Sequence, residues 1–258
     1  MKNVWITALE KDENTAKELF QTITRYGLNA GGHFWTDDLE KMEWAGAISE
    51  LSKKETALWI ITGKAESLAA ENVRYGLSLL AVAVHAQKGH GFPIFLVLTE
   101  GEIEPETLPT PLKGIDVLSA SSSGFGAKVT AQANMPVKKV ELEYRLDIHA
   151  LPGIGQWFEI GPARGHTWQG AMFGVDAGEI NFHGVGPSGR LPDKATLNYP
   201  MQGLKLKVGD TDYTAWAVKN DLNERSSYFV RVKDYPGSIL LGSFSEDDDA
   251  EAYVVTLK

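Results

Sequence analysis

Residues 57–98 constrain the fold more than any other part of the chain. The runs Ala57–Thr62 and Phe92–Thr99 are apolar at nearly every position, which indicates strands covered on both faces. Between them, residues 67–86 carry apolar side chains at helical spacing and end at Gly89. A strand, a helix and a second strand of these lengths form a parallel crossover unit. We therefore expect a parallel sheet.

Three further segments of the first half have the character of strands. They are Val4–Leu9, Leu28–Trp35, which is broken by two glycines, and Ile115–Leu118. Together with the two runs above, they give five strands that alternate with helices. This order predicts an open, doubly wound parallel sheet of the flavodoxin-like kind, with right-handed crossovers.

Two helices are expected before the crossover unit. Apolar residues recur at helical spacing over Ala16–Ile23, and Gly27 is placed to end that helix. Asp37 and Glu40 have the spacing of a capping box, which predicts a second helix that continues to Leu51.

The pattern changes near residue 125. Ser121–Gly126 is small and polar enough to be a linker, so we expect an α/β domain over 1–122 and a second domain over 128–258. In Val140–Ala150 apolar and polar residues alternate, as in an antiparallel strand with one wet face. Gly209-Asp210 has the form of a hairpin turn. The second domain is expected to be an antiparallel sandwich or barrel of seven or eight strands, whose other strand-like runs are 157–160, 171–175, 204–208, 213–218, 228–232, 238–241 and 252–257.

Composition excludes several classes of partner. The chain has 258 residues, a formal charge of −9 and no cysteine, and the acidity is spread over both halves. Nucleic-acid backbones and anionic membranes need clustered cations, so neither is expected as a partner. Leu77–Ala86 is about half as long as a bilayer span and contains His85. The sequence begins with a strand-like run and without a signal peptide, so we expect a cytoplasmic protein.

A doubly wound sheet binds ligands at the carboxyl ends of its strands. In this chain those ends are 8–14, 31–38, 62–72 and 99–102. No Walker motif or dinucleotide-binding glycine pattern is present, so the ligand and any cofactor stay unidentified.

Residues of the crossover unit resemble a known family. Trp59–Thr62, Ala70–Ser78 and Phe95–Leu98 are similar to the third-strand and following-helix region of TIR-like and nucleoside-deoxyribosyltransferase-like domains. The family's helix carries a pattern close to Asn-Val-x-x-Glu-Leu-Gly, whose Glu attacks or stabilises the anomeric carbon of a ribosyl group. Asn72-Val73 fits the start of that pattern, but the Glu position falls on Gly76. The resemblance covers about the first 120 residues.

The sequence thus offers candidate residues around one crevice. Arg74 has the chemistry to grip a phosphate, and the acids near the crevice are available to replace the missing glutamate. The candidate ligand-binding residues are Ala8, Thr62, Gly63, Ser67, Asn72 and Arg74, and the candidate catalytic acids are Glu71, Glu66 and Glu100.

No metal site is expected in the second half. His149, His166 and His183 occur at equal intervals with Glu159 and Asp176 between them, but spacing this wide does not indicate whether these residues converge on one ion. His149 belongs to the polar face of its strand, which predicts an exposed histidine.

Two other features of the second half have residue types that could bind a ligand. The acidic run Glu246–Asp249 lacks the spaced ligands of a calcium loop, which favours a solvated hairpin tip. Trp157 and Trp168 lie beside Gly/Pro loops, where exposed rings would form a binding surface.

Three hypotheses of function follow. The first is a TIR-like signalling module that has lost the catalytic glutamate and binds a nucleotide-like ligand, a protein partner or a second copy of itself. The second is an enzyme that cleaves an N-glycosidic bond or transfers a nucleoside with a carboxylate from elsewhere. The third is a structural or assembly protein.

Overall fold

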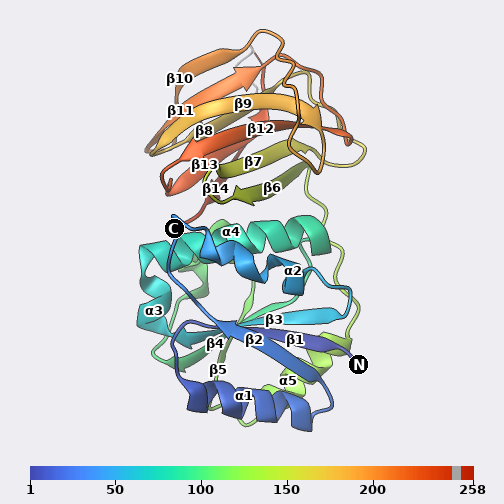
Figure 1. The fold of residues 1–258 in the computed structure, drawn as a ribbon, viewed down its shortest axis with the longest axis vertical. Coiled ribbons are helices and arrows are strands. Elements are labelled where there is room, and N and C mark those ends of the chain that lie inside the picture. The colour runs from blue at the N-terminus through green and yellow to red at the C-terminus, as the bar shows by residue number, and fades with distance from the viewer. Residues whose placement is uncertain (246–250) are drawn as a thin grey trace. The chain divides into compact units, whose positions relative to one another are not determined.

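The computed structural model describes residues 1–245 and 251–258 as two compact units, 1–140 and 141–258 (Figure 1). The first is an α/β unit and the second is all-β, as the sequence predicts. The acidic run 246–249 lies outside the described residues. Within the described residues, no helix has the length and apolarity that a bilayer span requires.

The first unit contains the expected five-stranded sheet. All of its pairings are parallel, and the strand order is β2-β1-β3-β4-β5. This order is the flavodoxin-like one, so the carboxyl ends of β1 and β3 lie side by side where the winding direction changes. The strands are β1 (Asn3–Ala8), β2 (Asn29–Phe34), β3 (Thr56–Lys64), β4 (Ile94–Glu100) and β5 (Asp116–Ser119).

Helices cover both faces of this sheet. Figure 1 shows α1 and α5 on one face and α4 on the other. Asp12 caps α1, and Gly27 lies beyond its end with a φ of 80° that favours glycine. The helices of this unit are α1 (Glu13–Arg25), α2 (Ile48–Leu51), α3 (Ala65–Ala69), α4 (Glu71–Lys88) and α5 (Phe125–Asn134), with 3₁₀ turns η1 (Glu43–Ala47), η2 (Pro105–Thr107) and η3 (Thr110–Leu112).

The helix expected from Asp37 to Leu51 does not form as one element. Asp38, and not Asp37, accepts the hydrogen bond from the Lys41 backbone amide. Met42 then has a left-handed backbone with a φ of 55°, which an α-helix cannot continue through. The remaining residues form the 3₁₀ turn η1 and the single helical turn α2.

The division between the units falls later than the sequence suggests. Ser121–Gly126 is not a linker, because α5 begins at Phe125 and belongs to the first unit. Phe125, Val129 and Ala133 are buried in the same core as β1, β3 and β4. Small residues within α5 hide its apolar stripe, and the first unit extends to Val140.

The second unit is an antiparallel sandwich. Its sheets have the orders β10-β11-β8-β13-β14 and β6-β7-β12-β9. Phe158 and Phe173 meet between the sheets with ring centroids 5.2 Å apart, and Gly209-Asp210 joins β10 to β11 as predicted. The strands are β6 (Tyr144–Leu151), β7 (Gly155–Pro162), β8 (Ala171–Val175), β9 (Glu179–Pro187), β10 (Met201–Val208), β11 (Thr211–Val218), β12 (Ser226–Lys233), β13 (Ser238–Ser243) and β14 (Ala252–Thr256).

Strand β9 is the element that the sequence pattern did not reveal. Gly184 and Gly186 interrupt its apolar alternation. Both glycines are required by close packing, because a Cβ at Gly184 would lie 2.8 Å from the Ala195 Cβ and one at Gly186 would lie 2.5 Å from the Pro192 Cβ. The segment after β9 therefore lies directly over this sheet.

His85, in the last turn of α4, makes the stability of the protein sensitive to acid. Burial, assisted by His90, lowers the pKa of His85 to about 4. As the pH falls, His85 is protonated in the unfolded chain before it is protonated in the folded chain. The contribution of neutral, buried His85 to the free energy of unfolding is therefore complete above about pH 6.5 and is lost as the pH falls toward 4. Between pH 7 and pH 4.5, we expect the free energy of unfolding of wild type, measured with urea, to fall by about 2 kcal/mol more than that of His85→Gln. His166→Gln is the control, and equal losses in wild type and His85→Gln would contradict the assignment.

Candidate functional site

A small cavity lies at the carboxyl ends of the parallel strands, where the sequence predicts the crevice. Its volume is about 90 Å³. Ala8 and Thr62, two of the predicted ligand-binding residues, contribute to its wall from β1 and β3. The other lining residues are Glu10, Asp12, Thr15, Ala16, Lys64 and Thr99.

Asp12 already occupies the anion-binding position at the start of α1. Its carboxylate accepts from the backbone amides of Asn14 and Thr15, at 3.0 and 3.2 Å, and from Thr15 Oγ1 at 2.7 Å. The hydrogen bond from the Thr15 hydroxyl is the largest cause that lowers the pKa of Asp12. A phosphate at this helix terminus would need the same amides and would meet a negative charge.

Glu10 is the second acid of the cavity. Its Oε1 accepts from the Lys64 backbone amide at 3.0 Å. Gly63, one of the predicted ligand-binding residues, leaves room for this contact. A Cβ at Gly63 would lie 2.9 Å from the Leu9 Cβ and 3.1 Å from Glu10 Oε1. The strand end 8–14 was predicted to border the crevice, but Glu10 and Asp12 were not singled out.

The remaining predicted ligand-binding residues are not among the residues that line the cavity. Ser67 lies on α3, and Asn72 is exposed in the first turn of α4. Arg74, the predicted phosphate ligand, donates from its guanidinium to the Thr107 carbonyl oxygen. This contact ties α4 to the loop after β4 and accounts for the arginine in structural terms.

The three candidate catalytic acids also lie outside the lining of the cavity. Glu66 is exposed on α3, and Glu71 is exposed as the first residue of α4. Glu100 is paired with Lys64, with Oε2 2.7 Å from Nζ, which lowers the pKa of Glu100. The side chain of Lys64 thus meets Glu100 while its backbone amide meets Glu10.

Gly76 is buried at the position where the resembled family carries its glutamate. A Cβ on Gly76 would lie 2.7 Å from Cζ2 of Trp35 and 3.4 Å from Cδ2 of Leu39. Both neighbours belong to the segment that follows β2, and the indole of Trp35 is itself buried. The space that a carboxylate would use is therefore filled by this ring.

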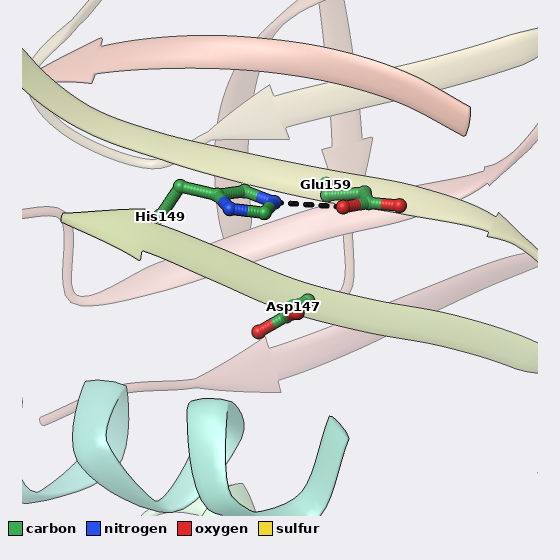
Figure 2. Close-up of side chains that lie close together, drawn as sticks. All are labelled: Asp147, His149 and Glu159. Atoms are coloured by element: carbon green, nitrogen blue, oxygen red, sulfur yellow. Dashed lines mark hydrogen bonds and ion pairs between the residues drawn. The ribbon is translucent and has the colours of Figure 1, made fainter. Parts of the chain in front are cut away.

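A polar cluster that the sequence did not predict lies in the second unit. We call Asp147, His149 and Glu159 the β6–β7 cluster. Asp147 and His149 are two residues apart on β6 and so share one face, and Glu159 on β7 is the direct partner of Asp147. Figure 2 shows His149 and Glu159 pointing toward one another, with Nε2 2.7 Å from Oε2. One potential ligand atom from each of the three side chains lies within 4.8 Å of the other two.

Glu159 is the buried centre of this cluster, with only 3% of its surface exposed. Its Oε1 accepts from Ser227 Oγ at 2.7 Å and from the Gly189 backbone amide at 2.8 Å. Arg145 Nη1 lies 3.7 Å from the same oxygen. The other oxygen, Oε2, faces His149, so each carboxylate oxygen has its own set of partners.

Arg145 is held in place by β12 and by the turn before it. Its guanidinium donates to Ser227 Oγ and to the carbonyl oxygens of Pro162, Asn223 and Ser226. Gly161 leaves room for this crossing, since a Cβ there would lie 2.6 Å from Arg145 Nη2. The arginine thus supplies a fixed positive charge behind Glu159.

The electrostatics of the cluster follow from these contacts. Burial alone would raise the pKa of Glu159, but the hydrogen bonds from His149, Ser227 and Gly189 outweigh it, and the pKa is lowered. The hydrogen bond to Glu159 raises the pKa of His149. Burial raises the pKa of Asp147 to about 6. Glu159 is therefore a carboxylate, whereas burial opposes the charge of Asp147.

The prediction of an exposed His149 is wrong, because the polar face of β6 is covered at this point. Only 22% of its side-chain surface is exposed. His183 is buried against Tyr228, with Nδ1 2.7 Å from the phenol oxygen, and His166 is exposed. The three histidines therefore do not converge. The alternation of polar and apolar residues along β6 was the sequence signal that could have grouped Asp147 with His149.

The two tryptophans suggested as surface candidates are both buried, each with 9% of its surface exposed. Trp157 lies under the guanidinium of Arg231, which is 5.5 Å from the ring centroid, and contacts the edge of Phe182. Trp168 forms an isolated bridge to Leu222. Of these rings only Phe182 is exposed, so no extended aromatic surface forms there.

Comparison with known proteins adds no family. No protein-family model and no curated protein matches the sequence. A solved structure described as a pilus assembly-related protein from Burkholderia pseudomallei K96243 has 14% identity and a TM-score of 0.35, covering 54% of this chain and 95% of its own. A two-domain esterase active on acetylated mannans, co-crystallised with mannopentaose, has 11% identity and a TM-score of 0.28, covering 99% of this chain and 89% of its own. Likenesses this weak support no conclusion about function.

Proposed function

We propose that this chain is a two-domain binding protein whose TIR-like α/β unit acts in protein recognition or self-association, without cleaving a ribosyl bond. The observation that carries the proposal is the contact between Gly76 and Trp35. Glycosyl transfer requires a carboxylate aimed at the sugar carbon. At the corresponding place in this chain a tryptophan ring is packed against a residue without a side chain.

The cavity argues against recognition of a nucleotide. Pockets that enclose ligands of nucleotide size have volumes of about 300–1,000 Å³, whereas this cavity has about 90 Å³. Asp12 also holds the amides that a phosphate would use. Both size and charge therefore oppose a nucleotide at this edge of the sheet.

One observation favours the enzymatic alternative. Glu10 lines the cavity beside Thr62 and Lys64, so it is a better placed displaced carboxylate than Glu66, Glu71 or Glu100. Its Oε1 is occupied by the Lys64 amide.

Incubation of the purified chain with nicotinamide dinucleotide tests the proposal directly. We expect no nicotinamide release above the rate in buffer, and no thermal shift with nicotinamide dinucleotide, ATP or ADP-ribose. A nucleotide at a hundred times its dissociation constant would add about 2.7 kcal/mol of stability, which such a screen detects. Turnover that is abolished in Glu10→Gln would establish the enzymatic alternative, and a nucleotide-induced shift would establish nucleotide binding.

A further inference from the structure

We propose that Asp147, His149 and Glu159 form a binding site for one divalent transition-metal ion of the zinc class. Imidazole nitrogen and carboxylate oxygen are the donors that zinc takes from His, Asp and Glu. The site lies entirely within β6 and β7, so the unit 141–258 contains all three ligands.

The separations within the cluster suit a single ion. Zinc lies about 2.1 Å from nitrogen and oxygen ligands, so two of its tetrahedral ligands are about 3.4 Å apart. His149 Nε2 and Glu159 Oε2 are 2.7 Å apart, and no separation among the three ligand atoms exceeds 4.8 Å. Side-chain rotations that move the ligand atoms by about 1–1.5 Å therefore bring all three to tetrahedral separations.

Hydrogen bonds to the backbone or to Ser227 engage one oxygen of each carboxylate. Glu159 Oε1 is fixed by Ser227 and Gly189, which leaves Oε2 toward His149. Asp147 Oδ1 accepts from the Ile148 amide at 2.7 Å, which leaves Oδ2. Metal-binding carboxylates are oriented in this way by hydrogen bonds to the oxygen that does not bind the ion.

Asp147 distinguishes a metal site from a simple ion pair. A His149–Glu159 bridge with Arg145 behind it already accounts for two of the three side chains. Within the described residues Asp147 makes no ion pair, although it is half-buried and directly opposite Glu159. A divalent ion gives this carboxylate a partner and balances the two carboxylates around a neutral imidazole.

Three protein ligands leave one tetrahedral position for water or another small ligand. Asp147 and His149 are half-buried, whereas Glu159 is buried. The proposal concerns binding of the ion and assigns no reaction to it.

Zinc titration of the EDTA-treated, dialysed full chain by isothermal titration calorimetry tests the site. We expect one ion per chain in wild type. His149→Gln and Asp147→Asn each remove a ligand, so each should weaken binding by about 100-fold or more, since loss of a residue that only orients a ligand already costs about 10–100-fold. Asp147→Asn keeps an oxygen for the Ile148 amide, so it should fold as wild type does by circular dichroism. His166→Gln removes an exposed histidine and should leave the affinity unchanged.

Several results would overturn the site. No zinc binding by the wild-type chain would exclude it, and so would equal affinities in wild type and Asp147→Asn. Loss of binding in His166→Gln would assign the ion to the exposed surface. None of these results concerns Glu10 or the nucleotide assays, so the metal site and the proposed function fail independently.

Discussion

Replacing Glu159 with alanine should lower the free energy of unfolding of the second unit by about 3–5 kcal/mol, as removal of one partner from a buried ion pair does. Glu159 accepts hydrogen bonds from His149, Ser227 and Gly189, and it lies 3.7 Å from the Arg145 guanidinium. The alanine variant leaves all of these donors facing a cavity. The positive charge of Arg145 then loses the carboxylate that lies 3.7 Å from it.

Urea unfolding in the presence of EDTA measures this loss without a contribution from metal. Glu179→Ala is the matched control, because Glu179 is exposed at the start of β9 and its loss should cost less than about 0.5 kcal/mol. Amide hydrogen exchange should place the loss of protection within 141–258. A difference below about 1 kcal/mol between the two variants would show that Glu159 is less coupled to its neighbours than their distances imply.

The parallel sheet could be predicted because its signal is local. A strand buried on both faces must be apolar at nearly every position, and Ala57–Thr62 and Phe92–Thr99 satisfy that condition without reference to the rest of the chain. The elements that were missed depend on distant contacts. β9 needs a glycine at position 184 because Ala195 packs on it. Helix α5 is anchored by the buried residues Phe125, Val129 and Ala133, which lie among other small residues.

The location of the crevice could be predicted for the same reason, but its chemistry could not. Strand order places Ala8 and Thr62 at one edge of the sheet whatever their neighbours are. Whether Gly76 faces open space or a ring is decided by Trp35, 41 positions earlier in the sequence. No periodic pattern carries that information.

The β6–β7 cluster shows the limit of alternation as a signal. The period of two correctly places Asp147 and His149 on one face of β6. It also predicts that this face is exposed, whereas Asp147 and His149 are half-buried, because the register of β7 sets Glu159 beside them and the Gly189 amide binds Glu159. Register and loop coverage are tertiary properties, so only coordinates identify the cluster.

Introducing glutamate at Gly76 should destabilise the first unit by about 3 kcal/mol or more, and it should not create nicotinamide release. A Cβ at this position would lie 2.7 Å from Trp35 Cζ2 and 3.4 Å from Leu39 Cδ2. Overpacking of this kind costs about 1–3 kcal/mol, and burial of an unpaired carboxylate adds to it. The better helix propensity of glutamate returns less than about 1 kcal/mol.

Gly46→Glu is the matched control, because Gly46 is exposed in η1 and has no atom within 4 Å of its would-be Cβ. It should change the unfolding free energy by less than about 0.5 kcal/mol in urea. Gly76→Ala should lie between the two variants, since it meets the same ring without the charge. If Gly76→Glu were as stable as wild type and released nicotinamide, Trp35 would have to leave this space readily. The site would then be one substitution away from a working glycosidase, and the proposal of a binding role would lose its basis.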